Sequence, residues 1–211
     1  MLRAPVLTGP RVRLEPVSPA HADDLFAAGH DGGDPALWDY LPYGPFRDVE
    51  EMRLWVAACA ASEDPRFFAI VERAGGRAAG MASYLRYAPD HRVVEIGHIW
   101  FGAALQRTPA ATETIHLLAR HAFGELGVRR LEWKCDAGNA RSRRAAERFG
   151  FSYEGVFRQH MLVKGRNRDT AWYAMLDREW PVHGTAYRAW LDPANFSEIG
   201  RQRRRLEEFR V

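Results

Sequence analysis

The stretch EIGHIWFGAALQRTPAATETI, residues 95–115, decides the fold. It starts as an apolar, strand-like run and becomes amphipathic, with the apolar spacing of a helix, from Pro109 onward. A strand, a short loop and a helix start often hold phosphate, because free backbone N–H groups at a helix N-terminus attract anions. Such loops are usually rich in glycine, whereas this one carries Pro109, Ala110 and Ala111. By themselves, these residues favour a plain helix start over a phosphate loop.

Strand-like and helix-like runs alternate on both sides of this stretch. Ser18 and Asn139 stand where helix N-caps are expected, and Gly150 stands where the helix after Asn139 should end. The order predicts one domain over residues 1–178 and a C-terminal extension over 179–211, packed on the domain or on a partner subunit. Periodicity predicts strands at 11–17, 67–73, 78–88, 91–101, 129–136, 151–163 and 169–176, and helices at 20–28, 48–61, 109–126 and 139–149.

The composition, 46% hydrophobic and 27% charged over 211 residues, is ordinary for a soluble globular protein. No run approaches the roughly 18 apolar residues of a membrane-spanning helix, and the first residues lack the apolar core of a signal peptide. We therefore expect a cytoplasmic protein without membrane contact. Two cysteines are too few for a disulfide framework or a cysteine-based metal site, and no metal is expected.

Arginine supplies nearly all the positive charge, since Lys134 and Lys164 are the only lysines. Arginine suits bidentate contacts with phosphate or carboxylate. A net charge of +3 does not by itself argue for nucleic acid, which is not the expected partner. The run RQRRR, residues 201–205, is expected to be the solvated face of a helix whose Leu206 and Phe209 pack inward.

Five segments together resemble the GNAT superfamily of acetyl-CoA-dependent N-acetyltransferases, and within it the RimJ/RimL-like branch that acetylates ribosomal-protein N-termini. The resemblance implies an α+β, three-layer α/β/α fold around a central mixed, twisted sheet. It also implies direct transfer of an acetyl group from acetyl-CoA to a primary amine. The segments are LTGPRVRLEPV (7–17), VVEIGHIWF (93–101), ATETI (111–115), NARSRRAAERFGF (139–151) and EGVFRQHMLVKGRNRD (154–169).

In this family two parallel strands splay apart, and the pantetheine of acetyl-CoA binds the exposed backbone edge of the first. The resemblance places that edge near Ile99, Trp100 and Phe101, whose side chains are expected to face the core. The alternative interpretation of these three residues is an ordinary core strand.

The family motif for the cofactor pyrophosphate, Q/R-x-x-G-x-G/A, falls on residues 106–111. Gln106 matches it, and Ala111 is an accepted variant. Pro109 replaces the first motif glycine, and Arg107 replaces a further glycine that the branch often has. These departures lower the specificity of the motif.

Anion binding remains physically possible in this loop. Thr108 can cap the helix, and the N–H groups of Ala110, Ala111 and Thr112 are then left to face a phosphate. Arg107 can add a charged donor. With the flanking resemblance, the loop is expected to bind the cofactor.

The resemblance also implies roles for the helix that starts at Asn139. Its N-x-x-S pattern would place the Asn139 amide near pantetheine and the Ser142 hydroxyl near the thioester sulfur, where it could protonate the departing thiolate. The alternative is a helix N-cap at Asn139 and a solvated Ser142. Other branches use a tyrosine later in this helix, but that position holds Ala146.

A base that deprotonates the amine is less clearly marked. The position that often holds a glutamate in this branch is Met161, and the adjacent His160 could replace it only if a bulge intervenes, because neighbours on a strand point to opposite faces. Glu95 has the spacing of the catalytic glutamate of the histone-acetyltransferase branch and is the expected base. Its alternative role is an ordinary polar residue, and water could also serve without a dedicated base.

The acceptor pocket of the family lies between the loop that joins the first two helices and the late hairpin. An aromatic pocket suits a small amine, an amino acid or a peptide N-terminus. A non-catalytic acyl-CoA-binding module and an RNA- or ribosome-binding protein are the rival functions, and a homodimer is possible. The acceptor residues are expected to be Trp38, Tyr40, Tyr43 and Phe46, with Arg158 and His160 opposite.

Overall fold

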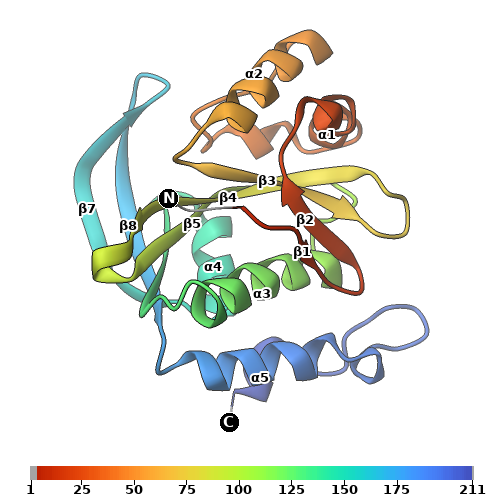
Figure 1. The fold of residues 1–211 in the computed structure, drawn as a ribbon, viewed down its shortest axis with the longest axis vertical. Helices are drawn as coiled ribbons and strands as arrows, with labels where there is room; N and C mark the ends of the chain where they lie inside the picture. Colours follow the sequence, from red (N-terminus) through yellow and green to blue (C-terminus); the bar gives the residue numbers. More distant parts are fainter. Residues whose placement is uncertain (1–3, 211) are drawn as a thin grey trace.

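The computed structural model describes residues 4–210 as an eight-stranded sheet with helices on both faces (Figure 1). The helices are α1 (Ala22–His30), α2 (Val49–Ala61), α3 (Pro109–Gly124), α4 (Ala140–Arg148) and α5 (Trp180–Leu191). The strands are β1 (Leu7–Thr8), β2 (Val12–Pro16), β3 (Arg66–Glu72), β4 (Ala78–Ala88), β5 (Val93–Phe101), β6 (Arg130–Asp136), β7 (Ser152–Val163) and β8 (Arg166–Leu176).

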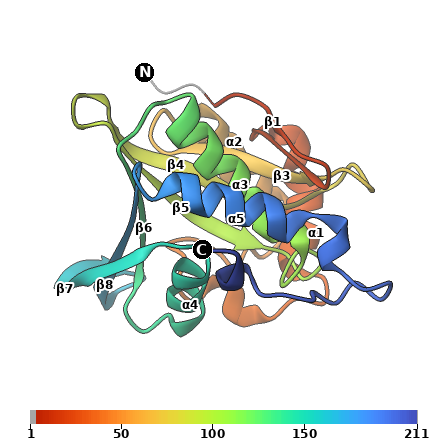
Figure 2. The ribbon, with the colours of Figure 1, turned by 90° about the horizontal axis from the view of Figure 1, so that it is seen from below.

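The sheet has the order β1-β2-β3-β4-β5-β6-β8-β7. Its neighbouring strands are antiparallel except β5 and β6, which run parallel and are joined through α3. Helices α1 and α2 cover one face, and α3, α4 and α5 cover the other (Figures 1 and 2). The predicted three-layer α/β/α arrangement around a mixed sheet is therefore confirmed. The face toward α1 and α2 is called the acceptor face below.

Two helical boundaries differ from the prediction. The chain after Ser18 first forms a 3-10 turn, Pro19–His21, before α1 begins. Residues 201–205 are not helical, because the side chain and backbone of Asn195 take the backbone N–H groups of Arg204 and Arg203. A 3-10 turn over Leu206–Phe209 follows, and Leu206 is buried as expected.

A buried carboxylate fixes α3 against the edge of the sheet. Glu113 is 2% exposed, accepts hydrogen bonds from the backbone N–H groups of Arg11 and Val12, and pairs with the Arg11 guanidinium at 3.4 Å. A Cβ atom at Gly9 would lie 1.8 Å from Glu113 Oε1, so only glycine fits there. These contacts set the position of the helix that starts at the predicted cofactor loop.

The C-terminal extension packs on the domain through α5, which runs beside α3 (Figure 2). Tyr187 and Trp190 of α5 join the hydrophobic core that α3 and β6 share, and the Tyr187 hydroxyl donates to the Phe149 carbonyl at 2.9 Å. Among residues 4–210, no helix is both long and apolar enough to cross a bilayer.

Candidate active site

Strands β5 and β6 separate halfway along their length. Their ladder pairs residues 93–96 with residues 130–133 and stops there, although β5 continues to Phe101 and β6 to Asp136. Beyond Ile96, β5 keeps β4 on one edge, and its other edge has no strand partner in the described part of the chain. Such an edge offers backbone N–H and C=O groups that need hydrogen-bond partners. The predicted splay is thus present, beside residues 99–101.

The side chains on this edge face the cores, as expected. Trp100 is 2% exposed and packs against Trp38 in the core beneath α1 and α2. Ile99 and Phe101 pack against the core on the opposite face. Residues 99–101 can therefore offer a ligand their backbone rather than their side chains.

A β-bulge lies in β5 where the strands separate. Trp100 pairs with Met81, but Gly97 pairs with Ser83, so β5 has one extra residue, and His98 adopts a φ of 50°. The bulge places the His98 ring on the acceptor face, stacked on Tyr43 at 5.6 Å and tilted against Phe67 at 5.0 Å. The sequence motif gave no role to His98.

The loop between β5 and α3 reverses direction at Arg107. This residue has a φ of 61°, a left-handed conformation that glycine adopts without strain, which agrees with the glycine that the family resemblance leads us to expect at this position. Its side chain is exposed and has no hydrogen-bond or ion-pair partner among residues 4–210. Gln106 closes the loop by donating to the Phe101 carbonyl at 2.9 Å.

The first turn of α3 is capped by threonine, as predicted. The Thr108 hydroxyl accepts a long hydrogen bond from the Ala111 N–H at 3.4 Å and donates to the Leu105 carbonyl at 2.7 Å. The N–H of Ala110 finds no protein acceptor within the described residues. The first turns of α1 and α2 each carry two acidic residues, whereas that of α3 carries none. The positive end of α3 is therefore not compensated by the protein's own carboxylates.

Thr112 can contribute only its backbone to this site. Its side chain is 2% exposed, and its hydroxyl accepts from Arg148 at 3.1 Å.

Comparing Arg107→Gly with Arg107→Ala separates the strain of the left-handed backbone from the contribution of the guanidinium to CoA binding. Arg107→Gly should raise the free energy of unfolding by about 1 kcal/mol relative to Arg107→Ala, because only glycine relieves the left-handed backbone. Both variants should bind CoA several-fold more weakly than the parent, since both lose the free guanidinium. Urea unfolding and calorimetric titration with CoA measure the two effects. Equal stability of the two variants would contradict the conformational argument.

Helix α4 begins at the open end of β6. Asn139 Oδ1 accepts the N–H of Ser142 at 3.0 Å, so Asn139 is an N-cap. Ser142 Oγ accepts from Trp133 Nε1 at 3.0 Å, which leaves the hydroxyl proton available for donation. Burial raises the pKa of the neighbouring Cys135 thiol, and a hydrogen bond with Ser142 opposes that shift. Ser142 is therefore half-buried and held in place by β6, rather than freely solvated.

Glu95 does not have the free carboxylate that a base needs. It is 4% exposed, and its Oε2 lies 2.6 Å from Arg86 and 2.9 Å from Lys134 Nζ. These contacts favour the alternative structural role of Glu95 over its expected role as a direct base. It belongs to an ion-pair chain that runs through Arg86, Glu95, Lys134, Glu132, Arg130 and Glu154.

The predicted acceptor residues divide into three environments. Trp38 is 1% exposed between α1 and the sheet, where Gly29 and Gly44 make room for its ring. Its side chain is therefore a core residue and not a substrate contact, which corrects the prediction. Tyr40 is exposed and donates to the Gly138 carbonyl at 3.2 Å, whereas Tyr43 is enclosed beside His98. Burial raises the pKa of the Tyr43 phenol well above its ordinary value.

The bulge that His160 requires is present in β7. Phe157 pairs with Thr170 and Met161 with Arg168, so β7 carries two extra residues between them, and Gln159 has a φ of 49°. His160 Nδ1 consequently lies 2.9 Å from Thr170 Oγ1. The ring of His160 thus turns toward β8, at the edge of the acceptor face.

The loop between α1 and α2 is held by contacts with the β7–β8 hairpin turn and with α4. Lys164, in the hairpin turn between β7 and β8, donates to the carbonyls of Trp38 at 2.9 Å and Gly44 at 2.6 Å. Asp34 pairs with Arg141 of α4 at 2.8 Å. In Figure 1 the hairpin rises to the level of this loop. The acceptor face is therefore walled by the hairpin, the loop and the start of α4.

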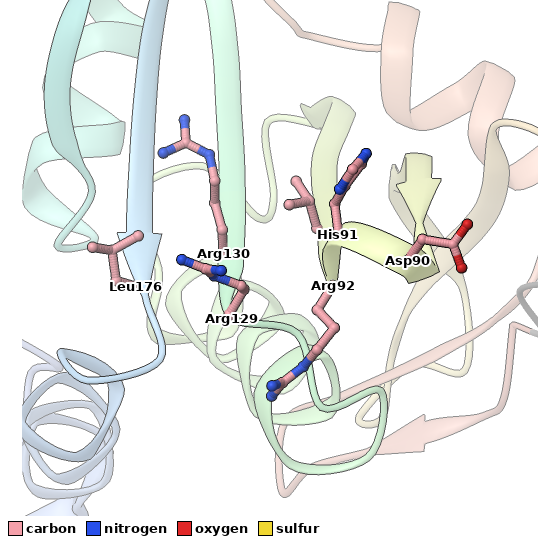
Figure 3. Close-up of a pocket in the computed structure, with 7 residues that line it drawn as sticks. Asp90, His91, Arg92, Arg129, Arg130 and Leu176 are labelled. Carbon is pink, nitrogen blue, oxygen red and sulfur yellow. The ribbon is translucent and has the colours of Figure 1, made fainter.

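A cavity of about 440 Å³ opens at the other ends of β5 and β6 (Figure 3). Arg129, Arg130 and Leu176 line one side of it, and Asp90 and His91 line the other. Arg130 and Asp136 lie six residue steps apart on β6, or roughly 20 Å of strand. Arg130 is already paired with Glu132 and Glu154. This cavity therefore lies away from the splay and is not the candidate site.

Several residues of the acceptor face were not predicted. The interrupted alternation at Gly97 could have indicated the bulge, since a glycine inside a strand often marks one. Lys134 and Trp172 stand opposite each other on β6 and β8, with Lys134 Nζ 3.8 Å from the centre of the Trp172 ring. That juxtaposition depends on register, which the sequence pattern does not give.

A splayed parallel pair, a bulged first strand and an uncompensated helix start thus lie together in one part of the sheet. The model of the acetyltransferase (GNAT) domain matches residues 11–152, and the chain belongs to that family, whose members use acetyl-CoA. It is 46% identical to a GCN5-related N-acetyltransferase from Brucella melitensis, whose crystal structure superposes with a TM-score of 0.97. The match covers 99% of this chain and 95% of the Brucella protein.

Two further relatives support the family. A GNAT-family protein from Chromobacterium violaceum ATCC 12472 is 41% identical, with a TM-score of 0.78 and coverage of 85% of this chain and 90% of that one. YdaF of Bacillus subtilis (strain 168), named provisionally as a ribosomal N-acetyltransferase, is 33% identical over 105 residues. That match spans 50% of this chain and 57% of YdaF. The name of YdaF agrees with the RimJ/RimL-like branch.

Proposed function

We propose that the protein transfers an acetyl group from acetyl-CoA to a primary amine that binds on the acceptor face. The splay between β5 and β6 carries this proposal, because it joins an open backbone edge to the N-termini of both α3 and α4. When bound, acetyl-CoA supplies the activated thioester. The edge at residues 99–101 would hold its pantetheine arm.

The start of α3 would hold the pyrophosphate. The N–H of Ala110 and the positive helix end attract an anion, and the exposed guanidinium of Arg107 adds a charged donor. Ala110 and Ala111 keep the approach of the phosphates open. Family membership, the open edge and the absence of first-turn carboxylates together favour this use over a plain helix start.

Ser142 is the proposed proton donor to the departing thiolate. Trp133 orients its oxygen by donating to it, so the hydroxyl proton can turn toward the splay. The carboxylates of Glu95 and Glu132 are held in the ion-pair chain. We therefore assign no protein base: the amine binds in its neutral form or loses its proton to water. His160 and Tyr43 remain proposed acceptor contacts.

An acetyl-CoA turnover screen over amines, amino acids and peptides tests this function. Ser142→Ala should lower kcat by about 100-fold with little change in the KM for acetyl-CoA, because general acid catalysis typically contributes that much. Ser142→Thr retains the hydroxyl and should recover most of kcat, and the exposed Ser152→Ala is a matched control.

The rival functions give different results in the same screen. Tight CoA binding without transfer to any amine would indicate a non-catalytic binding module. Unchanged turnover by Ser142→Ala would contradict the role of its hydroxyl.

A further inference from the structure

Arg168, a cation on the acceptor face, has no carboxylate partner among residues 4–210. Strands β6 and β8 place three buried or half-buried cations there, and Arg130 and Lys134 both belong to the ion-pair chain. Arg168 has no carboxylate within 4.0 Å among residues 4–210. Its Nε donates to Thr170 Oγ1 at 3.2 Å, so both terminal nitrogens of the guanidinium remain available. Those two nitrogens form the fork that binds a carboxylate.

Arg168 lies past the open end of β6, because Thr170 of β8 pairs with Asp136, the last residue of β6. Burial, together with the charges of Arg86 and Arg168, lowers the pKa of His98 to about 4, and Asp64 opposes this shift. The charge of Arg168 also acts to lower the pKa of the Cys135 thiol in β6, against the larger effect of burial, which raises it. By strand alternation Arg168 shares its face of β8 with Thr170 and Trp172, so its guanidinium stands on the acceptor face at the end where β5 and β6 are apart.

The same face carries buried polar atoms without a hydrogen-bond partner among residues 4–210. They are the indole nitrogens of Trp100 and Trp172, which can only donate, and the Tyr43 hydroxyl and His98 Nδ1, which can donate or accept. Buried polar groups normally find partners. A molecule that satisfies these donors must bring oxygen acceptors with it. The aromatic rings of Tyr43, Trp55 and Phe67, packed around His98, offer an apolar wall beside them.

We infer that the acceptor is a small amine that carries a carboxylate, namely a free amino acid with an apolar side chain, and that Arg168 binds the carboxylate. This inference rests on the proposed function and narrows its substrate class. A peptide N-terminus has an amide in place of the carboxylate and leaves the guanidinium without a counter-charge. Arg168 is in this assignment a specificity-determining residue, and it takes no part in proton transfer.

Matched acceptors test the inference. Phenylalanine, tryptophan and methionine are compared with their amides by CoA release, using the parent protein and Arg168→Gln. The parent should show a kcat/KM at least about 10-fold higher for the acids. Arg168→Gln should lower kcat/KM for the acids by about 10- to 100-fold, mainly through KM, and leave the amides within about 2-fold. Arg166→Gln, an exposed arginine two residues away, should change neither.

Four outcomes would overturn it. These are equal use of acids and amides by the parent, an equal loss on both substrates in Arg168→Gln, transfer only to peptide N-termini, and a preference for 2-aminoethyl phosphate over the amino acids. If no amine accepts an acetyl group, the proposed function fails, and the inference about Arg168 is then tested independently of turnover. Calorimetric titration of phenylalanine into the CoA-loaded protein provides that test. Binding that is lost in Arg168→Gln would support the inference, and no binding would reject it.

Discussion

Ala110→Glu should abolish CoA binding without destabilising the protein. Ala110 lies in the first turn of α3, where its N–H has no protein acceptor and no acidic residue precedes or follows it in that turn. A glutamate there places its charge beside the site of the pyrophosphate. Two like charges about 4 Å apart cost roughly 4 kcal/mol at an effective dielectric constant near 20, so the affinity for CoA should fall by at least about 100-fold.

The stability of this variant makes the result specific. An acidic side chain near a helix N-terminus stabilises the helix by about 0.3–1 kcal/mol, so unfolding should occur at the same or a slightly higher urea concentration. Ala110→Gln has nearly the same shape without the charge and should lose far less affinity. CoA titration and urea unfolding of both variants provide the measurement. If Ala110→Glu still bound CoA like the parent, the pyrophosphate would lie elsewhere.

Residues 95–115 illustrate how much of the site could be predicted. The strand, the threonine cap and the helix start at Pro109 follow from local preferences that act within a few residues, and all three are present. The left-handed backbone at Arg107 was signalled only by the position of a missing glycine. Local chemistry therefore predicted the secondary structure of this segment well.

The acceptor face could not be predicted in the same way. Its arrangement depends on register, and the bulges at His98 and Gln159 shift which side chains share a face. Trp38 shows a second limit of the prediction, because the sequence does not tell whether an aromatic residue in a loop packs inward, as Trp38 does. Glu95 was expected to be a free base because spacing alone cannot reveal Lys134 on the adjacent strand. Such errors arise from long-range pairing rather than from local propensity.

Lys134→Met should lower the free energy of unfolding by about 3–5 kcal/mol. Lys134 Nζ lies 2.9 Å from Glu95 and 2.7 Å from Glu132, and the lysine side chain is 5% exposed. Methionine fills the same volume but leaves two buried carboxylates with less compensation, and removal of one partner of a buried ion pair typically costs this much. For a chain of this size the melting temperature should fall by roughly 6–20 °C.

The partners of Lys134 distinguish a charge effect from a packing effect. In the triple variant Lys134→Met, Glu95→Gln, Glu132→Gln, the carboxylates left behind are neutral, so much of the lost stability should return. Arg47→Ala breaks an exposed pair with Glu51 and should change stability by less than about 0.5 kcal/mol. A triple variant as unstable as Lys134→Met would show that packing against Trp172, and not charge, is the main contribution of Lys134. Because the ion-pair chain lies where β5 and β6 separate, recovery in the triple variant would show that this region requires matched charge, and that Glu95 is charged there as the partner of Lys134.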